Sequence, residues 1–260
     1  MLFRSEVIEG ARGDMALLEV ENLSKRFFEL PALDRVSVQV HPGELLGIIG
    51  PNGSGKTTLF NCISGVLRSD AGSVRFRGEE ITNHSADSVF SRGIARTFQL
   101  IQVFPEMTVL ENMLMAAQER DGTLIGRLLK REPEEVKQRA RELLEYLGID
   151  FLRENLASNL SYGQQKLLDF GMALMSKPEI ILLDEPLAGV NPTMIQSLVH
   201  HIEDLNARGH TFVVIEHNME IMMSLCRRIV VLSQGQQIAE GTPEEVAENP
   251  LVLDAYFGRN

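Results

Sequence analysis

The sequence has no tryptophan, only two cysteines among its 260 residues, and few aromatic side chains, at 6% of the chain. Cys62 and Cys226 are far apart and have no metal-ligand spacing, which argues against a disulfide framework and against a zinc site. We expect both thiols to be buried and reduced. The hydrophobic share of 44% is enough for a proper core, so the composition is that of a folded globular protein.

Basic residues and long apolar runs are also scarce. The chain has 25 Lys and Arg against 36 Asp and Glu, a formal net charge of -11, which argues against nucleic-acid binding and against attraction to anionic lipids by charge alone. No apolar run approaches the ~20 residues that a membrane helix needs, and the N-terminus has no apolar signal core. We therefore expect a cytoplasmic protein in which any membrane role depends on partner chains. Residues 1–14 are polar and lack a period, so we expect a flexible N-terminal extension before a single domain of residues 15–260.

Two kinds of apolar pattern predict two kinds of β-sheet. Alternating apolar and polar residues predict half-exposed antiparallel strands around 18–20, 36–40 and 74–76. Continuous apolar runs predict parallel strands buried on both faces at 45–49, 180–183 and 212–215. Helical patterns follow the capping boxes that begin at Thr108 and Thr242, and another occurs around 136–147. This alternation predicts an α/β fold with an antiparallel edge and an inserted helical block.

A phosphate-binding loop lies between the first buried strand and a helix that we expect to begin near Lys56. Its glycines let backbone N–H groups surround a phosphate, and the helix N-terminus adds the positive end of its dipole. Lys56 can reach the β- and γ-phosphates of ATP, and the Thr57 hydroxyl can coordinate Mg²⁺. A glycine-rich turn without a ligand is the alternative, which the flanking strand and helix disfavour. The predicted nucleotide-binding residues of this loop are Gly50, Pro51, Asn52, Gly53, Ser54, Gly55, Lys56, Thr57 and Thr58.

Two adjacent carboxylates, Asp184 and Glu185, follow directly after the buried strand around 180–183. Asp184 can hold Mg²⁺ directly or through water, as enzymes with a phosphate-binding loop require. Glu185 can accept a proton from the attacking water or orient it. An ordinary solvated strand end is the alternative, but it does not explain why an apolar strand stops at paired acids in a chain with this loop.

Residues 160–165, Leu-Ser-Tyr-Gly-Gln-Gln, stand about twenty positions before the acid pair and closely resemble the signature motif of ABC (ATP-binding cassette) ATPases. From the residues alone, Ser161 and Gln164 form a capping box at a helix start, and such a capped N-terminus with a flanking glycine is also an anion site. The resemblance implies that Ser161, Gly163 and Gln164 bind the γ-phosphate of a nucleotide held by the opposite protomer.

The same resemblance implies functions for three further residues. Gln99, after Arg96-Thr97-Phe98, is similar to the glutamine that contacts Mg²⁺ and the lytic water in ABC ATPases. His217 is similar to the histidine that touches the γ-phosphate. Phe27 is similar to the aromatic residue that stacks on adenine, although a plain hydrophobic strand end is an alternative.

Within the ABC family, residues 15–260 look like the ATPase subunits of branched-chain amino acid importers. The marks are Tyr162 with the doubled Gln164-Gln165, the segments 188–192 and 215–219, and the tail from Gly241 to Pro250. Gly171-Met172 departs from the Ala-Arg that is more usual after the signature, which leaves the cargo open. The resemblance implies a core with a parallel sheet, an antiparallel β subdomain and an inserted helical subdomain at about 101–164.

The resemblance also implies the cofactors and partners. Members of this family bind ATP and Mg²⁺, hydrolyse ATP in a homo- or heterodimer with a second ABC ATPase, and drive two transmembrane permease subunits from the cytoplasmic face of the cell membrane. An external solute-binding protein delivers the substrate, and nucleic acid has no part. The alternatives are an ATPase for urea or amide import, one for lipopolysaccharide export, a non-transport ABC protein, and a regulatory module with a dead site.

Overall fold

The computed structural model describes residues 15–97, 101–117 and 133–258. The predicted extension of residues 1–14 and Gln99 lie outside the described residues. In the part of the chain that is described, no helix has both the length and the apolar character needed to cross a membrane.

The larger sheet has six strands in the order β10–β9–β3–β8–β7–β6. Strands β9, β3, β8, β7 and β6 are parallel to their neighbours, and β10 pairs antiparallel with β9. Strand β10 is therefore an antiparallel edge strand of this sheet, which the sequence did not predict. The strands are β3 (Leu45–Ile49), β6 (Ile94–Thr97), β7 (Ile180–Asp184), β8 (Thr211–Ile215), β9 (Arg228–Ser233) and β10 (Gln236–Gly241).

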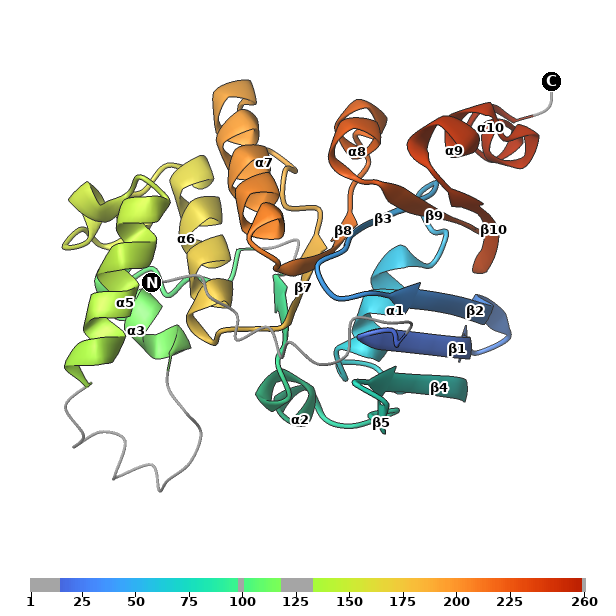
Figure 1. Ribbon diagram of the computed structural model, residues 1–260, viewed down its shortest axis with the longest axis horizontal. Helices are drawn as coiled ribbons and strands as arrows, with labels where there is room; N and C mark the ends of the chain where they lie inside the picture. Colours follow the sequence, from blue (N-terminus) through green and yellow to red (C-terminus); the bar gives the residue numbers. More distant parts are fainter. Residues whose placement is uncertain (1–14, 98–100, 118–132, 259–260) are drawn as a thin grey trace.

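Strand β3 shows why its apolar run is continuous. Leu45 and Ile49 join one hydrophobic cluster, with residues of the helices α7 (Pro192–Ala207) and α8 (Met219–Leu225). Leu46 and Ile48 join a second cluster, with α1 (Lys56–Ile63) and the smaller sheet. Successive side chains of a strand point to opposite faces, so a strand that is covered on both sides needs apolar residues at every position. The prediction of buried parallel strands is confirmed, and Figure 1 shows helices on both sides of this sheet.

The smaller sheet is antiparallel, in the order β2–β1–β4–β5, and is confirmed where the alternating pattern predicted it. In β1, Leu18 and Val20 are buried and Glu21 is exposed, because one face packs on α1 and the other meets solvent. The strands are β1 (Leu18–Phe27), β2 (Leu30–Val40), β4 (Ala71–Phe76) and β5 (Glu79–Glu80).

The helices begin where the sequence places their caps. Thr108, Ser161 and Thr242 each accept a hydrogen bond from the backbone N–H three residues further on, and all three capping boxes are complete. The helix expected around 136–147 begins at Glu134 and ends at Tyr146. The remaining helices are α2 (Ala86–Ser91), α3 (Val109–Ala116), α5 (Glu134–Tyr146), α6 (Tyr162–Met175), α9 (Pro243–Glu248) and α10 (Pro250–Phe257), with short 3₁₀ turns at Asp150–Leu152 and Ala157–Asn159.

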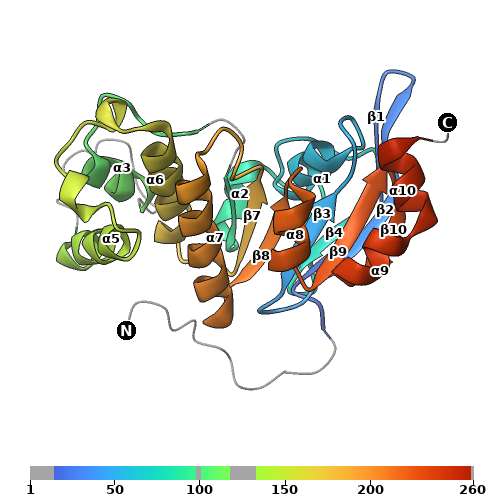
Figure 2. The ribbon, with the colours of Figure 1, turned by 90° about the horizontal axis from the view of Figure 1, so that it is seen from above.

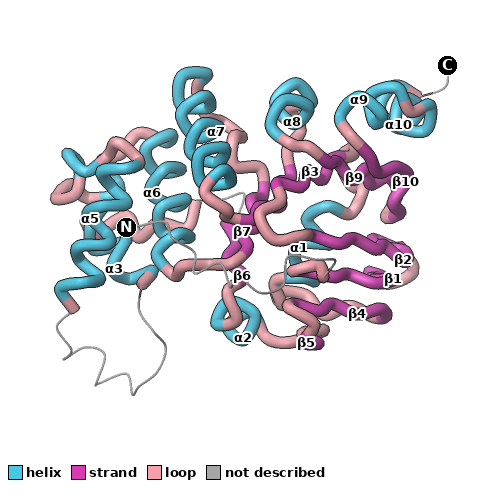
Figure 3. The backbone as a smooth tube through the Cα atoms, in the orientation of Figure 1, coloured by secondary structure: helices cyan, strands magenta, loops and turns pink. Residues whose placement is uncertain are grey.

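Helices α3, α5 and α6 form a group without strands at one end of the molecule, and the antiparallel sheet lies at the other end (Figures 2 and 3). Gly171 in α6 explains part of this packing. A Cβ atom there would lie 2.8 Å from Leu147 Cδ1 and 3.2 Å from Met113 Sδ. The departure from the usual residue at this position therefore allows α6 to approach its two neighbours closely. The predicted boundary of the helical subdomain, about 101–164, stays a prediction, and α6 continues this packing to Met175.

A buried carboxylate joins this helical group to the segment after the undescribed residues 98–100. Asp169 of α6 is 7% exposed, and its Oδ1 accepts a hydrogen bond of 3.2 Å from the backbone N–H of Gln102. Burial raises the pKa of Asp169 to about 6, although the Gln102 N–H and the charge of Lys166 act in the opposite direction. The folded state therefore retains the Asp169 proton to higher pH than the unfolded chain does.

This carboxylate predicts a pH dependence of stability. As pH rises from about 4 to about 6, the unfolded chain ionises first, so Asp169 lowers the free energy of unfolding by roughly 2–3 kcal/mol over this window. Asp169→Asn keeps an oxygen for the Gln102 N–H but cannot ionise, so its stability should decline less over the same range. Urea denaturation followed by circular dichroism between pH 4 and pH 7 measures the difference. Parallel pH profiles for the two proteins would contradict the assignment.

Candidate active site

The loop between β3 and α1 has the backbone of a phosphate-binding loop. Gly50 has φ +152°, and a Cβ atom on it would lie 2.1 Å from the Leu232 carbonyl oxygen, so no other residue fits there. Gly55 is the N-cap of α1 with φ +106°, and it supplies no side-chain cap. The first N–H groups of α1 therefore have no capping side chain, which is the arrangement that anions bind.

Lys56 is held inside this loop. Its side chain is buried, and Nζ donates hydrogen bonds to the carbonyl oxygens of Gly50 at 2.8 Å and Pro51 at 3.0 Å. Burial lowers the pKa of Lys56, while the negative charges of Glu185 and Asp184 raise it. The ammonium group is thus fixed in the loop, close to the predicted catalytic residue Glu185 and the predicted metal ligand Asp184.

A cavity of about 170 Å³ opens beside the loop. The cavity lies between the loop and two residues, Glu185 and His217, that follow β7 and β8. These residues come near the loop because the carboxyl ends of parallel strands meet at one edge of a sheet. Gly50 and Pro51 do not line it. The lining residues are Ala32, Asn52, Gly53, Ser54, Gly55, Lys56, Thr57, Thr58, Glu185 and His217.

Asp184 is the last residue of β7 and is 2% exposed. Its Oδ2 accepts a hydrogen bond of 2.7 Å from Nη2 of Arg96, a residue of β6. Its Oδ1 is buried and has no hydrogen-bond partner among the described residues. A buried carboxylate oxygen of this kind fits a hard cation such as Mg²⁺, which prefers oxygen ligands.

Glu185 and His217 form a direct pair. His217 Nε2 lies 2.6 Å from Glu185 Oε1, and Glu185 is the more buried of the two, with side-chain exposures of 12% and 44%. Glu185 has φ +48°, a backbone conformation that is uncommon for residues other than glycine and that often marks functional sites. Its backbone N–H donates to the Ile215 carbonyl at 2.9 Å, so this turn is tied to the end of β8.

Sequence reasoning missed Glu216, which connects the two loops of this pair. Its side chain is buried and accepts hydrogen bonds from the N–H groups of Leu187 at 2.7 Å and His217 at 3.1 Å. Burial raises the pKa of Glu216, and these two N–H groups lower it. The available signal was a charged residue directly after the buried strand β8. Arg96 was missed as well, since its neighbour Asp184 comes 88 positions later.

Phe27, which has a predicted nucleotide role, is not brought to this cavity. Phe27 ends β1, is 46% exposed and does not line the cavity. The Lys25 ammonium lies 5.9 Å from its ring centroid. Stacking of Phe27 on adenine stays a prediction, and Gln99 lies outside the described residues.

The signature residues also lie apart from the cavity. Ser161 Oγ accepts from the Gln164 N–H at 3.4 Å, and Gln164 Oε1 accepts from the Ser161 N–H at 2.9 Å, at the start of α6. Gly163 lies against α7, where a Cβ would meet Met194 Cγ at 2.8 Å. None of the three residues lines the cavity beside the phosphate-binding loop.

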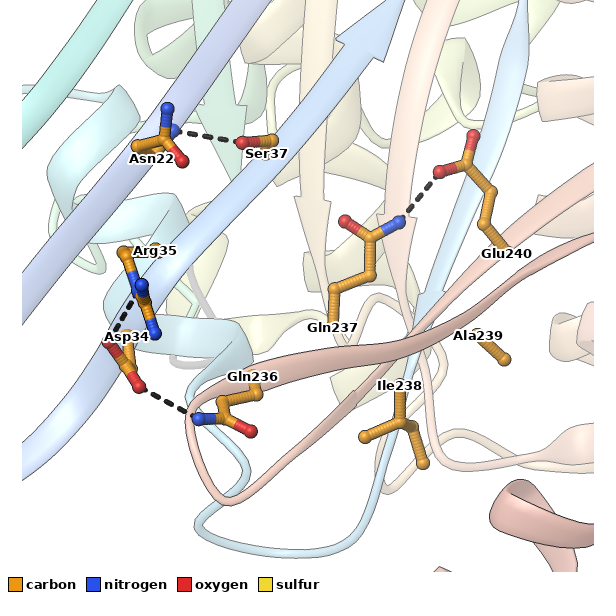
Figure 4. Close-up of a pocket in the computed structure, with 9 residues that line it drawn as sticks. All are labelled: Asn22, Asp34, Arg35, Ser37, Gln236, Gln237, Ile238, Ala239 and Glu240. Atoms are coloured by element: carbon orange, nitrogen blue, oxygen red, sulfur yellow. Dashed lines mark hydrogen bonds and ion pairs between the residues drawn. The ribbon is translucent and has the colours of Figure 1, made fainter.

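A second, larger hollow of about 560 Å³ lies between β2 and β10 (Figure 4). Its polar side chains mostly bond to one another: Gln236 Nε2 donates to Asp34 Oδ2 at 2.7 Å, and Gln237 Nε2 donates to Glu240 Oε2 at 2.7 Å. None of the predicted site residues lines it. The smaller cavity is therefore the candidate active site.

Family models and curated relatives agree on the kind of protein. The ABC transporter model matches residues 33–188, and a model of the branched-chain amino acid ATP-binding cassette transporter matches residues 236–260. A probable branched-chain amino acid transport ATP-binding protein LivG of Archaeoglobus fulgidus is 42% identical over 94% of this chain and 96% of its own length. The high-affinity branched-chain amino acid transport ATP-binding protein LivG of Escherichia coli K12 is 39% identical over 93% of this chain and 98% of its own length.

Solved structures agree with the fold. A nucleotide-free ATP-binding cassette from an ABC transporter is 40% identical, with a TM-score of 0.84 over 94% of this chain and 100% of that one. The ADP conformation of an ATP-binding cassette of an ABC transporter gives the same identity and TM-score over 95% of this chain. With its phosphate-binding loop, paired acids and this likeness over nearly the whole length, the chain belongs to the ABC transporter family, as one of its ATP-hydrolysing cassettes.

Proposed function

We propose that this chain is the ATPase subunit of an importer for branched-chain amino acids and drives two transmembrane permease subunits from the cytoplasmic face of the membrane. An external solute-binding protein delivers the substrate to the permeases. The observation that carries the proposal is the match of residues 236–260 to the branched-chain amino acid cassette model, because the ATPase core alone is common to many cargoes. In the structure these residues include the antiparallel edge strand β10 and the helices α9 and α10.

The chain's own residues act together on the phosphates. The N–H groups at the start of α1 and the Lys56 ammonium bind the β- and γ-phosphates of ATP. Glu185 orients the attacking water and takes its proton, and His217 holds the Glu185 carboxylate in place and lies near the γ-phosphate. Mg²⁺, held by Thr57 and Asp184 with Gln99, would supply positive charge to the β- and γ-phosphate oxygens.

A second ABC ATPase completes the site. Ser161, Gly163 and Gln164 do not line the cavity of their own chain, and the capped start of α6 is a ready anion site. In the proposed dimer, this helix end of one chain meets the γ-phosphate bound by the other. Removal of that phosphate breaks the bridge and lets the dimer reopen, which is a ligand-biased two-state change. The partner is another copy of this chain or a related ATPase.

Residues 103–105 are proposed to receive a permease helix. Phe104 in this segment is 47% exposed. Its backbone is fixed by the fully buried Asn112, whose Oδ1 accepts from the Phe104 N–H at 2.7 Å and whose Nδ2 donates to the carbonyls of Phe104 and Thr108 at 3.1 and 2.9 Å. Such a fixed exposed aromatic residue resembles the anchors that dominate protein interfaces.

Transport in proteoliposomes tests both the cargo and this surface. The chain is reconstituted with a permease pair that co-purifies with it and with a solute-binding protein, and ATP-dependent uptake of labelled leucine is compared with uptake of labelled urea. Phe104→Ala should reduce leucine uptake about tenfold, because loss of an interface anchor costs about 1–2 kcal/mol, while the ATP turnover of the isolated cassette is unchanged. Phe257→Ala, which removes an 82% exposed aromatic side chain from α10, is the matched control and should have no effect.

Uptake of urea without leucine would reject the proposed cargo and keep the ATPase. Full leucine uptake by the Phe104→Ala transporter would reject the proposed permease surface.

A further inference from the structure

Arg96 is a buried arginine in β6, at the edge of the larger sheet. Its backbone pairs with Leu182 of β7, and its side chain is 5% exposed. A buried guanidinium group is costly unless its charge and N–H groups are satisfied. Its contacts therefore show what the residue does.

The guanidinium group joins two elements of the active site. Nη2 donates to Asp184 Oδ2 at 2.7 Å, at the end of β7. Nη1 donates to Asn61 Oδ1 at 2.7 Å and to Ser64 Oγ at 2.9 Å, and these two residues belong to the end of α1 and its C-cap. The guanidinium carbon also lies 5.6 Å from the centroid of the Phe60 ring. One side chain thus fixes β7 against α1.

These two elements carry the two described residues that are proposed to hold Mg²⁺, Thr57 near the start of α1 and Asp184 at the end of β7. A small octahedral cation tolerates little variation in ligand distance, so the relative position of the two elements affects its affinity. Arg96 also leaves the two oxygens of Asp184 in different states. Oδ2 is engaged by Arg96, and Oδ1 has no hydrogen-bond partner among the described residues.

We propose that Arg96 is a positioning residue for the divalent cation. It holds the Asp184 carboxylate by one oxygen and sets its distance from α1, so that the other oxygen is available to the cation. It does not line the nucleotide cavity, so it acts through Asp184 and α1 and not on the nucleotide. This inference rests on the proposed binding of Mg²⁺ by Asp184.

Cation binding, measured apart from catalysis, tests the proposal. Mn²⁺ replaces Mg²⁺, and free Mn²⁺ is followed by electron paramagnetic resonance with the full-length chain and saturating ADP. Arg96→Met should weaken Mn²⁺ binding about 10- to 100-fold, the range found when groups that orient metal ligands are removed. Arg96→Lys keeps the positive charge but loses the planar set of guanidinium N–H donors. The Mn²⁺ affinity of this variant should therefore lie between those of the Met variant and the parent. The affinity for ADP in EDTA should change by less than about twofold in all variants, since free nucleotide does not depend on the carboxylate position.

Arg92→Met is the matched control. Arg92 is the C-cap of α2, four positions before Arg96, and its guanidinium bonds to Ser88 and not to an active-site residue. Its Mn²⁺ affinity should equal that of the parent. If Arg96→Met does not fold, Asn61→Ala and Ser64→Ala each remove one anchor of the guanidinium and should weaken Mn²⁺ binding several-fold.

Two results would overturn the inference, and a third would reject the proposed metal site on which it rests. Unchanged Mn²⁺ affinity in the Arg96 variants would mean that the ion pair only supports the fold. Tighter Mn²⁺ binding would mean that Arg96 competes with the cation for Asp184. Unchanged Mn²⁺ affinity in Asp184→Asn would instead reject the proposed metal site itself, whatever the Arg96 variants show.

Discussion

Glu185→Gln should reduce steady-state ATP hydrolysis by about 100- to 1,000-fold or more and leave ATP binding within about threefold of the parent. Proton acceptance by a positioned side chain contributes about 10²–10⁴ in rate, and glutamine cannot accept the proton of the attacking water. Glutamine has nearly the same shape and can still bond to His217, which lies 2.6 Å from the carboxylate in the parent. The release of phosphate measures the rate of ATP hydrolysis. Because ATP stays unhydrolysed in this variant, an ATP-bound dimer should accumulate, and light scattering after size-exclusion chromatography detects it.

Glu179→Gln is the matched control for this variant. Glu179 directly precedes β7, at the opposite end of the same strand, and pairs with Arg77 at 2.8 Å on the surface. The control should hydrolyse ATP at the parental rate and form no stable dimer. A parental rate in Glu185→Gln would show that another group activates the water.

Lys56→Ala should weaken ATP binding by at least about 100-fold. A charge-assisted hydrogen bond to phosphate is worth about 1.5–3 kcal/mol, and each 1.4 kcal/mol changes affinity tenfold. The buried ammonium group also bonds to the Gly50 and Pro51 carbonyls, so its loss loosens the loop that surrounds the phosphates. Because the chain has no tryptophan, binding is measured with a fluorescent ATP analogue or by calorimetry.

Lys137→Ala removes a lysine from α5, where its partner is Glu134 at 3.9 Å, and serves as the control with parental affinity. A thermal melt of Lys56→Ala without nucleotide separates loss of binding from loss of folding. Parental ATP affinity in a folded Lys56→Ala protein would reject the assignment of the phosphate-binding loop.

Local patterns predicted the elements of the fold and most of the site. The capping boxes at Thr108, Ser161 and Thr242 are complete in the structure, because a cap depends only on residues three positions apart. The buried strands could likewise be predicted from the sequence, because a strand that is covered on both faces requires apolar residues at each position. The order of those strands was not predicted, because strand pairing depends on contacts between distant parts of the chain.

The same limit applies to the site. Lys56, Asp184 and Glu185 stand in local motifs, so their functions could be predicted from the sequence alone. Arg96 and Glu216 act through partners that sequence spacing does not reveal, such as Asp184 for Arg96 and the Leu187 N–H for Glu216. Their roles appear only when the sheet brings those partners within hydrogen-bond distance.

The sequence by itself determined that this chain has a glycine-rich loop between a strand and a helix, two adjacent acids after a buried strand and a capped helix at residue 161, because each is a local arrangement of backbone and neighbouring side chains. Only the tertiary structure decided which of them share one cavity. It brings Glu185 and His217 beside the loop and leaves Ser161 outside that cavity. The physical reason is the parallel sheet, which gathers the carboxyl ends of β3, β7 and β8 at one edge, while α6 begins in a separate helical layer.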